Sequence, residues 1–377
     1  MTGVEIVGVG LHPFGRFEDA TATSMGVTAL RAALDDAGWS VADARAKVGA
    51  AFCATAYGGV AAGHRVLGGL ALTGIPIVDV EAGCASGGAA LQLGAQAIAD
   101  GRYDTVLVFG VEKMPKGIIR SSFFAPWQEQ AGLAATPAYF ALRAQRTMAD
   151  HGITKDDLAA LVVKNRAWGE HNPNAMFRAA VTLEQVLASR VVCEPLHLWM
   201  LCSPNEGAAA VVLRRAEGIR GVRLGAVALR SHLPGNVLDE STPMAGLVDD
   251  AGITPPTTLA ARDAYEAAGV GPGDLDVVEC QDTDAARELL TWAELGLCGP
   301  GEQRSMLAEG GRGEVVNRSG GLLSKGEPLG ASALGQVVEL VGQLRGTAGP
   351  RQVPGARVAL AHTIGRGANA SVTILTT

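Results

Sequence analysis

Residues Glu81–Ala99 read EAGCASGGAALQLGAQAIA, which is the end of a strand, a turn of small residues and an Ala/Leu/Gln helix. A second stretch, Val315–Leu340, repeats that order as VNRSGG, LLSKGEPLGAS and an Ala/Leu/Val helix. The similarity indicates a weak internal duplication, with the halves meeting near Glu217–Gly221. Each half then places the N-terminus of a Gly-rich helix at a shared interface, where glycine and alanine let two backbones approach closely.

The rest of the chain alternates short β-branched runs with longer amphipathic stretches, which is typical of an α/β protein. The predicted strands are Val4–Val9, Ile75–Val80, Thr105–Gly110, Ala208–Leu213, Val222–Ala228, Val277–Cys280, Val358–Ala361 and Ala370–Leu375. The predicted helices are Ser24–Ala37, Gly87–Ala99, Tyr139–His151, Lys155–Glu170, Thr182–Ala188, Thr258–Ala268, Asp284–Leu295 and Ala331–Gly346. The segment 115–137 has no clear period and is predicted to be a lid-like insertion.

Composition excludes several classes of protein. Of the 377 residues, 48% are hydrophobic and 18% charged, which indicates a globular chain rather than a disordered one. The net charge of −7 argues against nucleic acid as a partner. No window offers eighteen strongly apolar residues, and the N-terminus lacks the pattern of a signal peptide, so we expect no membrane segment. Six cysteines without a C-x-x-C pair predict neither a disulfide framework nor a metal site, and favour a reducing cytoplasm.

Cys84 is the candidate nucleophile. It lies between the strand that ends in IVDVEAG and the helix that begins SGGAALQ, so its thiol should sit at or just before the first turn of a buried helix. Unpaired N–H groups and the positive end of the helix dipole favour a thiolate there. The position alone leaves two interpretations open, because a buried cysteine is more commonly a small hydrophobic residue.

Long stretches of the chain resemble the thiolases of the sterol-carrier-protein type, a branch that includes lipid-transfer proteins. The resemblance rests on VEAGCASGGAALQLGAQAIADGRYDTVLVFGVEKM, KNRAWGEHNPNAMFRAAVTLEQVLASRVVCEPLHL, SPNEGAAAVVL, RELLTWAELGLCGPGE and VNRSGGLLSKGEPLGAS. It implies a duplicated five-layer αβαβα fold, with two mixed sheets around buried helices and halves at 1–217 and 218–377. It also implies a homodimer, acyl-CoA or acyl-carrier thioester substrates, no other cofactor and no metal. Cys84 takes the place of the acyl-accepting cysteine.

Two positions depart from the family pattern. Gln281 stands where such thiolases carry a histidine in a His-Asp-x-Phe segment; it either donates a hydrogen bond in an oxyanion hole or bonds a neighbouring loop. Glu327, in SKGEPLGAS, replaces the histidine of a Gly-His-Pro motif that takes the proton of the nucleophilic cysteine. A carboxylate opposes thiolate formation, so Glu327 is either a general base or a sign of lost thiolase activity.

The remaining proton-transfer candidate is His362, which ends a predicted strand before a glycine turn. The family arrangement implies oxyanion donors at the backbone N–H of Cys84 and at one residue of 364–367.

Three functions follow as hypotheses. The first is an acyltransferase that forms an acyl-cysteine and passes the acyl group to a carbon or heteroatom nucleophile. The second is a retro-aldol lyase that acts on a β-hydroxyacyl-CoA with an OB-fold partner, a reaction that needs no acyl-cysteine. The third is a non-catalytic subunit that binds acyl-CoA or acts as a scaffold. The intact CASGG turn favours the first hypothesis.

Overall fold

The computed structural model describes residues 3–117, 119, 126–132, 135–218, 221–233, 254–308, 310–365 and 369–377. Its main sheet has nine strands in the order β3-β2-β4-β7-β1-β8-β11-β10-β9. In the N-terminal half these are β1 (Val4–Gly15), β2 (Ala50–Ala54), β3 (Ile77–Val80), β4 (Thr105–Lys113) and β7 (Glu206–Arg215). In the C-terminal half they are β8 (Val222–Ser231), β9 (Val277–Glu279), β10 (Val358–Ile364) and β11 (Asn369–Thr376).

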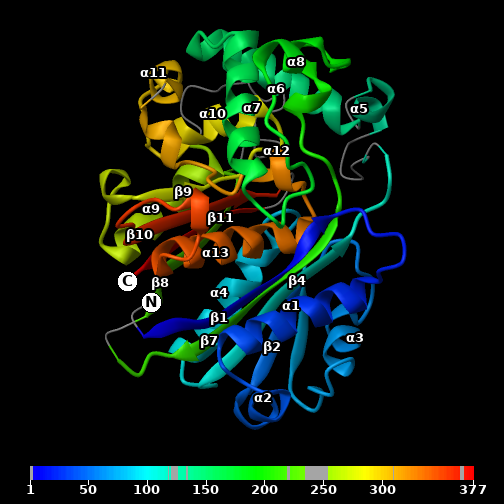
Figure 1. Ribbon diagram of the computed structural model, residues 1–377, viewed down its shortest axis with the longest axis vertical. Coiled ribbons are helices and arrows are strands. Elements are labelled where there is room, and N and C mark those ends of the chain that lie inside the picture. Colours follow the sequence, from blue (N-terminus) through cyan, green and yellow to red (C-terminus); the bar gives the residue numbers. More distant parts are fainter. Residues whose placement is uncertain are drawn as a thin grey trace.

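Each half of this sheet mixes parallel and antiparallel strands. In the first half β2 runs parallel to β3 and β4, whereas β4, β7 and β1 pair antiparallel. In the second half β8, β11 and β10 pair antiparallel and β9 runs parallel to β10. In the described part of the main sheet, the β1–β8 ladder joins the two half-sheets through two residue pairs, Glu5 with Arg223 and Ile6 with Val222. The two predicted mixed sheets are therefore present, and they are continuous along this short seam (Figure 1).

Helices α4 (Ser86–Ala99) and α13 (Leu329–Arg345) lie between the two half-sheets and contact both of them (Figure 1). Helices α1 (Ala22–Asp36) and α3 (Ala62–Gly68) cover the outer face of the first half-sheet, and α9 (Pro256–Ala268) covers that of the second. Helix α2 (Val41–Lys47) follows α1. The predicted α/β fold of five layers with buried helices at its centre is thus confirmed.

Small residues set the distance between the central helices. A methyl group added to Gly87 on α4 would lie 2.9 Å from Cβ of Ala333 on α13, and one added to Gly110 on β4 would lie 2.0 Å from the carbonyl oxygen of Gly330. The prediction that each half contributes a Gly-rich helix to a shared interface is confirmed.

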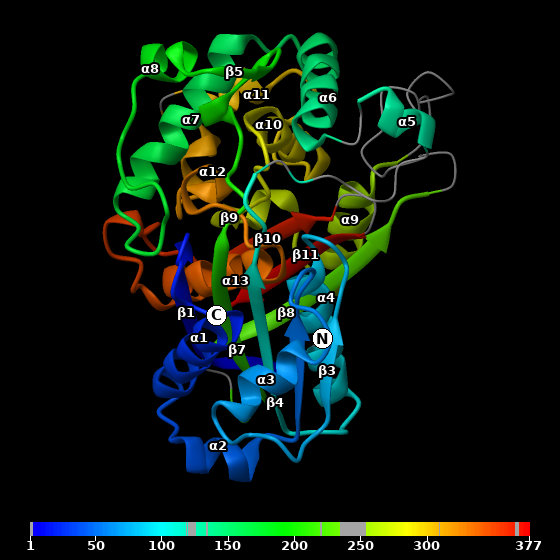
Figure 2. The same ribbon diagram turned by 90° about the vertical axis from the view of Figure 1, so that its right-hand side faces the viewer.

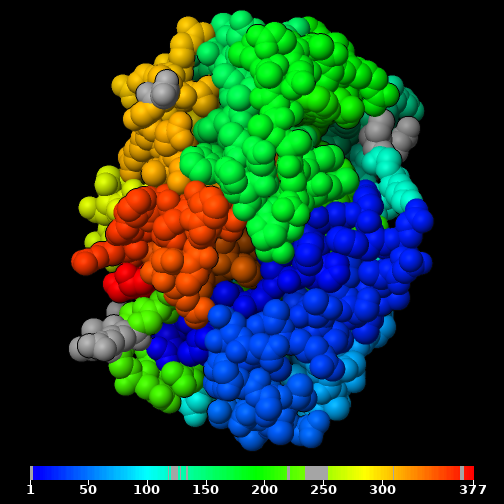
Figure 3. Space-filling view, in the orientation of Figure 1, coloured from blue at the N-terminus to red at the C-terminus, as the bar shows by residue number. Residues whose placement is uncertain are grey.

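A cap of helices covers the ends of the central helices, at the top of Figures 1 and 2. It contains α5 (Pro126–Gln130), α6 (Thr136–His151), α7 (Lys155–Glu170) and α8 (Leu183–Ala188), the β5–β6 hairpin (Val191–Cys193, Leu196–His197), α10 (Ala285–Glu294), α11 (Gln303–Leu307) and α12 (Gly321–Lys325). Residues of α6 and α7 share one hydrophobic core with α10 and α12. In Figure 3 the green cap residues accordingly lie against both the blue N-terminal and the orange C-terminal parts.

Of the predicted lid at 115–137, the structure describes 115–117, 119, 126–132 and 135–137, which include α5, and the rest of the range lies outside the described residues. Strand β2 and the short helices α2, α3, α11 and α12 were not predicted. None of the described helices is both long enough and apolar enough to cross a membrane.

Candidate active site

Cys84 lies two residues before α4, in a turn that follows β3. The N–H of Ser86 donates to the carbonyl of Gly83 at 3.1 Å, and the Ser86 hydroxyl accepts from the N–H of Ala82 at 2.8 Å. Gly83 has a φ of 59°, in the left-handed region that favours glycine. The predicted position of Cys84 at the start of a buried helix is confirmed, and the residue is 8% exposed.

Glu327 lies in the short connection between α12 and α13, where its carboxylate accepts two hydrogen bonds. Oε1 accepts from Nε2 of Gln281 at 2.7 Å, and Oε2 accepts from Sγ of Cys202 at 3.3 Å. The backbone N–H of Glu327 donates to the carbonyl of Ser203 at 2.9 Å, so two segments far apart in the sequence fix this side chain.

Gln281 connects Glu327 to the last strand hairpin. It lies two residues after β9 and is fully buried, and its Oε1 accepts from the N–H of Ile364 at 2.6 Å. The amide therefore bonds the last residue of β10 with its oxygen and Glu327 with its nitrogen.

Cys202 is the member of this cluster that the sequence analysis missed. Burial raises the pKa of the Cys202 thiol well above its usual value, and the charges of Glu327, Asp282 and Cys84 raise it further. The thiol therefore stays protonated and donates to Glu327. A negative charge on Cys84 would raise the pKa of Cys202 slightly further, so the two cysteines lie within electrostatic range of each other. The sequence feature that could have identified Cys202 is its position directly before SPNEGAAAVVL, one of the stretches that resemble thiolases.

The described backbone donors of the last glycine turn are engaged within the protein. The N–H of Ile364 bonds Gln281, and the N–H of Gly365 donates to the carbonyl of Asn369 at 2.8 Å. The rest of the range predicted to supply an oxyanion donor, residues 366 and 367, lies outside the described residues.

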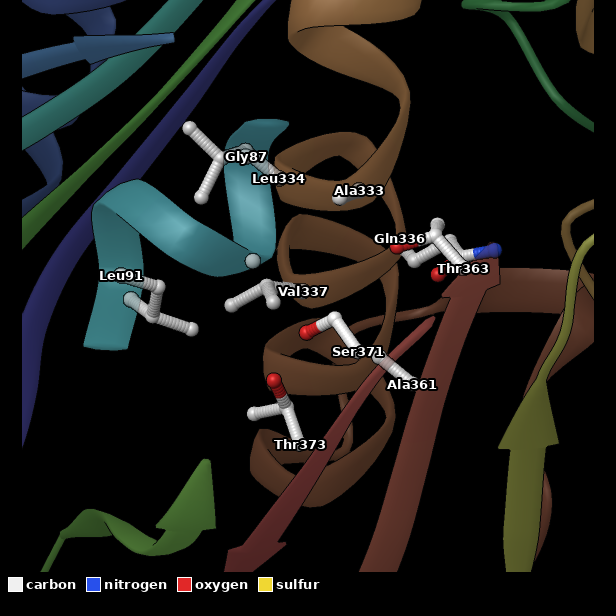
Figure 4. Close-up of a pocket in the computed structure, with 11 residues that line it drawn as sticks. Gly87, Leu91, Ala333, Leu334, Gln336, Val337, Ala361, Thr363, Ser371 and Thr373 are labelled. Carbon is white, nitrogen blue, oxygen red and sulfur yellow. The ribbon is translucent and has the colours of Figure 1, made fainter. Parts of the chain in front are cut away.

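The structure does not bring His362 together with the other three predicted residues. Its neighbours Ala361 and Thr363 face the space beside α4 and α13, as Figure 4 shows. Because side chains alternate along a strand, His362 faces the opposite side of β10. There it is completely buried and its Nε2 lies 3.1 Å from Oγ1 of Thr257 on α9. Burial, with a smaller contribution from Arg287, holds its pKa well below the usual value.

A buried carboxylate connects both halves next to this cluster. Glu112, near the end of β4, accepts from the N–H groups of Ala56 at 2.8 Å, Tyr57 at 3.0 Å and Gly330 at 3.1 Å, and from the Thr55 hydroxyl at 3.2 Å. Burial raises the pKa of Glu112 despite these hydrogen bonds. Gly330 is three residues after Glu327, so Glu112 holds the start of α13.

A layer of buried charges supports the site from the cap. Asp282 accepts from the N–H of Leu322 at 2.6 Å at the start of α12, and burial followed by the charge of Glu288 raises its pKa well above the usual value. Asn165 on α7 donates to both Asp282 and Glu288, at 3.0 and 2.6 Å. In the parts of the chain that the structure describes, no group of three His, Cys, Asp or Glu residues could hold a metal ion.

The architecture and the cysteine at the helix start are those of a thiolase, and comparisons with known proteins agree. The family model described as "Thiolase, N-terminal domain" matches residues 4–217, and "Thiolase C-terminal domain-like" matches residues 244–377. The chain belongs to the thiolase family.

Two relatives match over nearly the whole chain. An acetyl-CoA acetyltransferase from Methanothermobacter thermautotrophicus is 36% identical over 97% of both chains. The benzoylsuccinyl-CoA thiolase subunit BbsB from Thauera aromatica is 35% identical over 97% of this chain and 96% of its own. Sterol carrier protein 2 from Oryctolagus cuniculus is 36% identical over 84% of this chain, and the match spans 62% of that longer protein.

Among solved structures, the Ltp2-ChsH2(DUF35) aldolase superposes with a TM-score of 0.84 at 22% identity, covering 100% of this chain and 98% of that one. At this identity the likeness shows the fold alone.

Proposed function

We propose that Cys84 is the acyl-accepting nucleophile of this thiolase-like acyltransferase. The observation that carries the proposal is the position of Cys84 at the start of a buried helix, within electrostatic range of the hydrogen-bonded pair Cys202 and Glu327. The N-terminal end of α4 favours a negative charge on sulfur, which offsets the repulsion from the carboxylate.

In the first step the sulfur of Cys84 attacks the carbonyl carbon of an acyl-CoA or acyl-carrier thioester. A bond forms between that carbon and Cys84, the bond to the carrier sulfur breaks, and the proton of the Cys84 thiol ends on the departing thiol. Glu327 is the general base that moves this proton, in the place where a histidine works in the related family pattern. Gln281 and Cys202 hold its carboxylate in position.

In the second step a bond forms between the acyl carbon and a carbon or heteroatom nucleophile, and the bond to the sulfur of Cys84 breaks. Glu327 takes the proton which that nucleophile loses and passes it to the released sulfur of Cys84. His362 has no part in the proposed steps, because its side chain faces α9.

The test is intact-mass measurement after incubation with short acyl-CoA thioesters. Wild type should gain the mass of one acyl group, and Cys84→Ala should gain none. Cys202→Ser is the matched control, because it removes the neighbouring thiol and leaves the nucleophile. Glu327→Gln should slow adduct formation or its discharge by about 10²- to 10⁴-fold, the usual contribution of a general base.

Three outcomes would contradict the proposal. An adduct that persists in Cys84→Ala places the nucleophile elsewhere. A chain that cleaves a β-hydroxyacyl-CoA in the presence of an OB-fold partner, without any acyl-enzyme, is a lyase. An inert chain that only binds acyl-CoA is a scaffold.

We further propose a homodimer that forms at the edge strand β3. This strand ends the main sheet, Val78 on it is 45% exposed, and Leu93 on the neighbouring α4 is equally exposed. An apolar strand edge can pair antiparallel with the same edge of a second copy across a twofold axis. Sedimentation analysis should give a dimer for wild type and a monomer for Val78→Lys, and a wild-type monomer would contradict the proposal.

A further inference from the structure

Arg166 on α7 is a buried cation without a counter-charge among the residues that the structure describes. The residue is 7% exposed, and its Nε atom is fully buried without a hydrogen-bond partner. In the same part of the chain, the Arg166 side chain makes no hydrogen bond and no ion pair. Its one recorded interaction is with the ring of Phe177, whose centroid lies 4.2 Å from the guanidinium carbon.

Every other buried lysine and arginine of the described chain has polar partners. Arg143 pairs with Asp284, Arg287 with Glu294, and Lys325 with Glu279, whereas Arg318 donates to three backbone carbonyls. Burial lowers the pKa of Arg166 to about 10, so it remains charged at neutral pH. An isolated buried charge is costly, which is why such groups are normally paired. Arg166 is therefore a charged side chain that no described residue neutralises.

The guanidinium lies close to the segment that carries Glu327. Helix α7 packs on α12 (Figures 1 and 2), and the N–H of Phe177 donates to the carbonyl of Ser324 at 2.9 Å. Next to Phe177, Sδ of Met176 accepts from Nδ2 of Asn205 at 3.7 Å, and the backbone N–H of Asn205 donates to the carbonyl of Glu327 at 3.4 Å. The cation therefore belongs to the surroundings of the reaction centre.

We propose that Arg166 binds a terminal carboxylate on the acyl group of the substrate, so that the preferred thioester is that of a dicarboxylic acid. The inference rests on the proposed acyl transfer at Cys84. A guanidinium presents a planar fork of donors that matches one carboxylate. The phosphates of CoA are the other source of oxyanions, but they are bulky and multiply charged, whereas only 7% of Arg166 is exposed.

The test compares succinyl-CoA with butyryl-CoA. Both acyl groups have four carbons, but succinyl ends in a carboxylate and butyryl in a methyl group. Wild type should acylate about 10- to 100-fold more efficiently with succinyl-CoA, the range expected for a charge-assisted hydrogen bond. Arg166→Gln should abolish this preference, and Arg166→Lys should keep part of it. Arg178→Gln is the matched control, because that arginine is exposed on the segment that follows α7, next to Phe177.

Two further measurements distinguish a carboxylate at Arg166 from a CoA phosphate and from a failure of the proposed nucleophile. If Arg166→Gln weakens both thioesters equally and the effect vanishes with their dephospho-CoA forms, the anion is a CoA phosphate and the proposal is overturned. Calorimetric binding to Cys84→Ala measures the same preference without any acyl-enzyme. A preference for succinyl-CoA there supports the Arg166 site even if the nucleophile is wrong, and equal affinity for both thioesters overturns it.

Discussion

Replacing Glu112 by glutamine tests whether this carboxylate holds the two halves of the site together. The carboxylate accepts four hydrogen bonds, two at each oxygen: Oε1 from Tyr57 and Thr55, and Oε2 from Ala56 and Gly330. A glutamine side chain must place its NH₂ group where one of these oxygens was. At least one backbone N–H then faces another donor.

The expected loss of stability follows from the less costly of the two orientations of the glutamine amide. With the NH₂ group toward Thr55, the hydroxyl can turn and accept, so only the N–H of Tyr57 loses its acceptor. One unsatisfied buried donor costs about 1 to 3 kcal/mol. Glu112→Gln should therefore lower the free energy of unfolding by about that amount, and Glu112→Ala should lower it more because all four donors lose their acceptor.

Urea denaturation of wild type and both variants at one pH measures these differences. Glu18→Gln is the control: the Glu18 side chain is 85% exposed and pairs with the exposed Lys116, so its loss should change stability by less than about 0.5 kcal/mol. If Glu112→Gln is as stable as Glu18→Gln, the carboxylate does not hold the loop and α13 as described.

Three other changes have defined outcomes. Gly110→Ala should destabilise by about 3 kcal/mol or more, because its methyl group would meet the backbone of Gly330 at 2.0 Å; thermal unfolding checks this, and a wild-type midpoint would refute it. Gly342→Ala, in α13, would place its methyl group 3.7 Å from Oγ1 of Thr347, an ordinary van der Waals contact. It should stabilise by about 0.5 to 1 kcal/mol in the same assay, and a loss of stability would show that the position is crowded. The pKa of His362 is lower in the folded protein than in the unfolded chain, so the unfolded state binds more protons at this residue. Wild type should therefore lose stability as the pH falls below about 6.5, by at most about 1.4 kcal/mol per pH unit. His362→Gln should remove that part of the slope in denaturation between pH 5 and 7.5, and parallel curves for the two proteins would contradict the burial of His362.

Local sequence patterns were enough to locate the main strands and helices. The predicted strand at Val358–Ala361 and the predicted helix at Lys155–Glu170 both occur in the structure, because alternating and 3.6-residue apolar periods directly reflect which face is buried. Strand β2, AAFCA, was missed because a run of small residues shows little alternation between apolar and polar side chains. Short helices such as α12 were missed because five residues span barely more than one turn.

The sequence by itself determined the family, the α/β class and the place of Cys84, since each follows from residues that are neighbours along the chain. Tertiary structure alone decided which distant groups meet. It gave Glu327 the donors Gln281 and Cys202, turned His362 toward α9 through the pleat of β10, and buried Arg166 without an ion pair to any described residue. Contacts between residues 46 to 125 positions apart depend on how helices and strands pack, and the local sequence does not determine that packing.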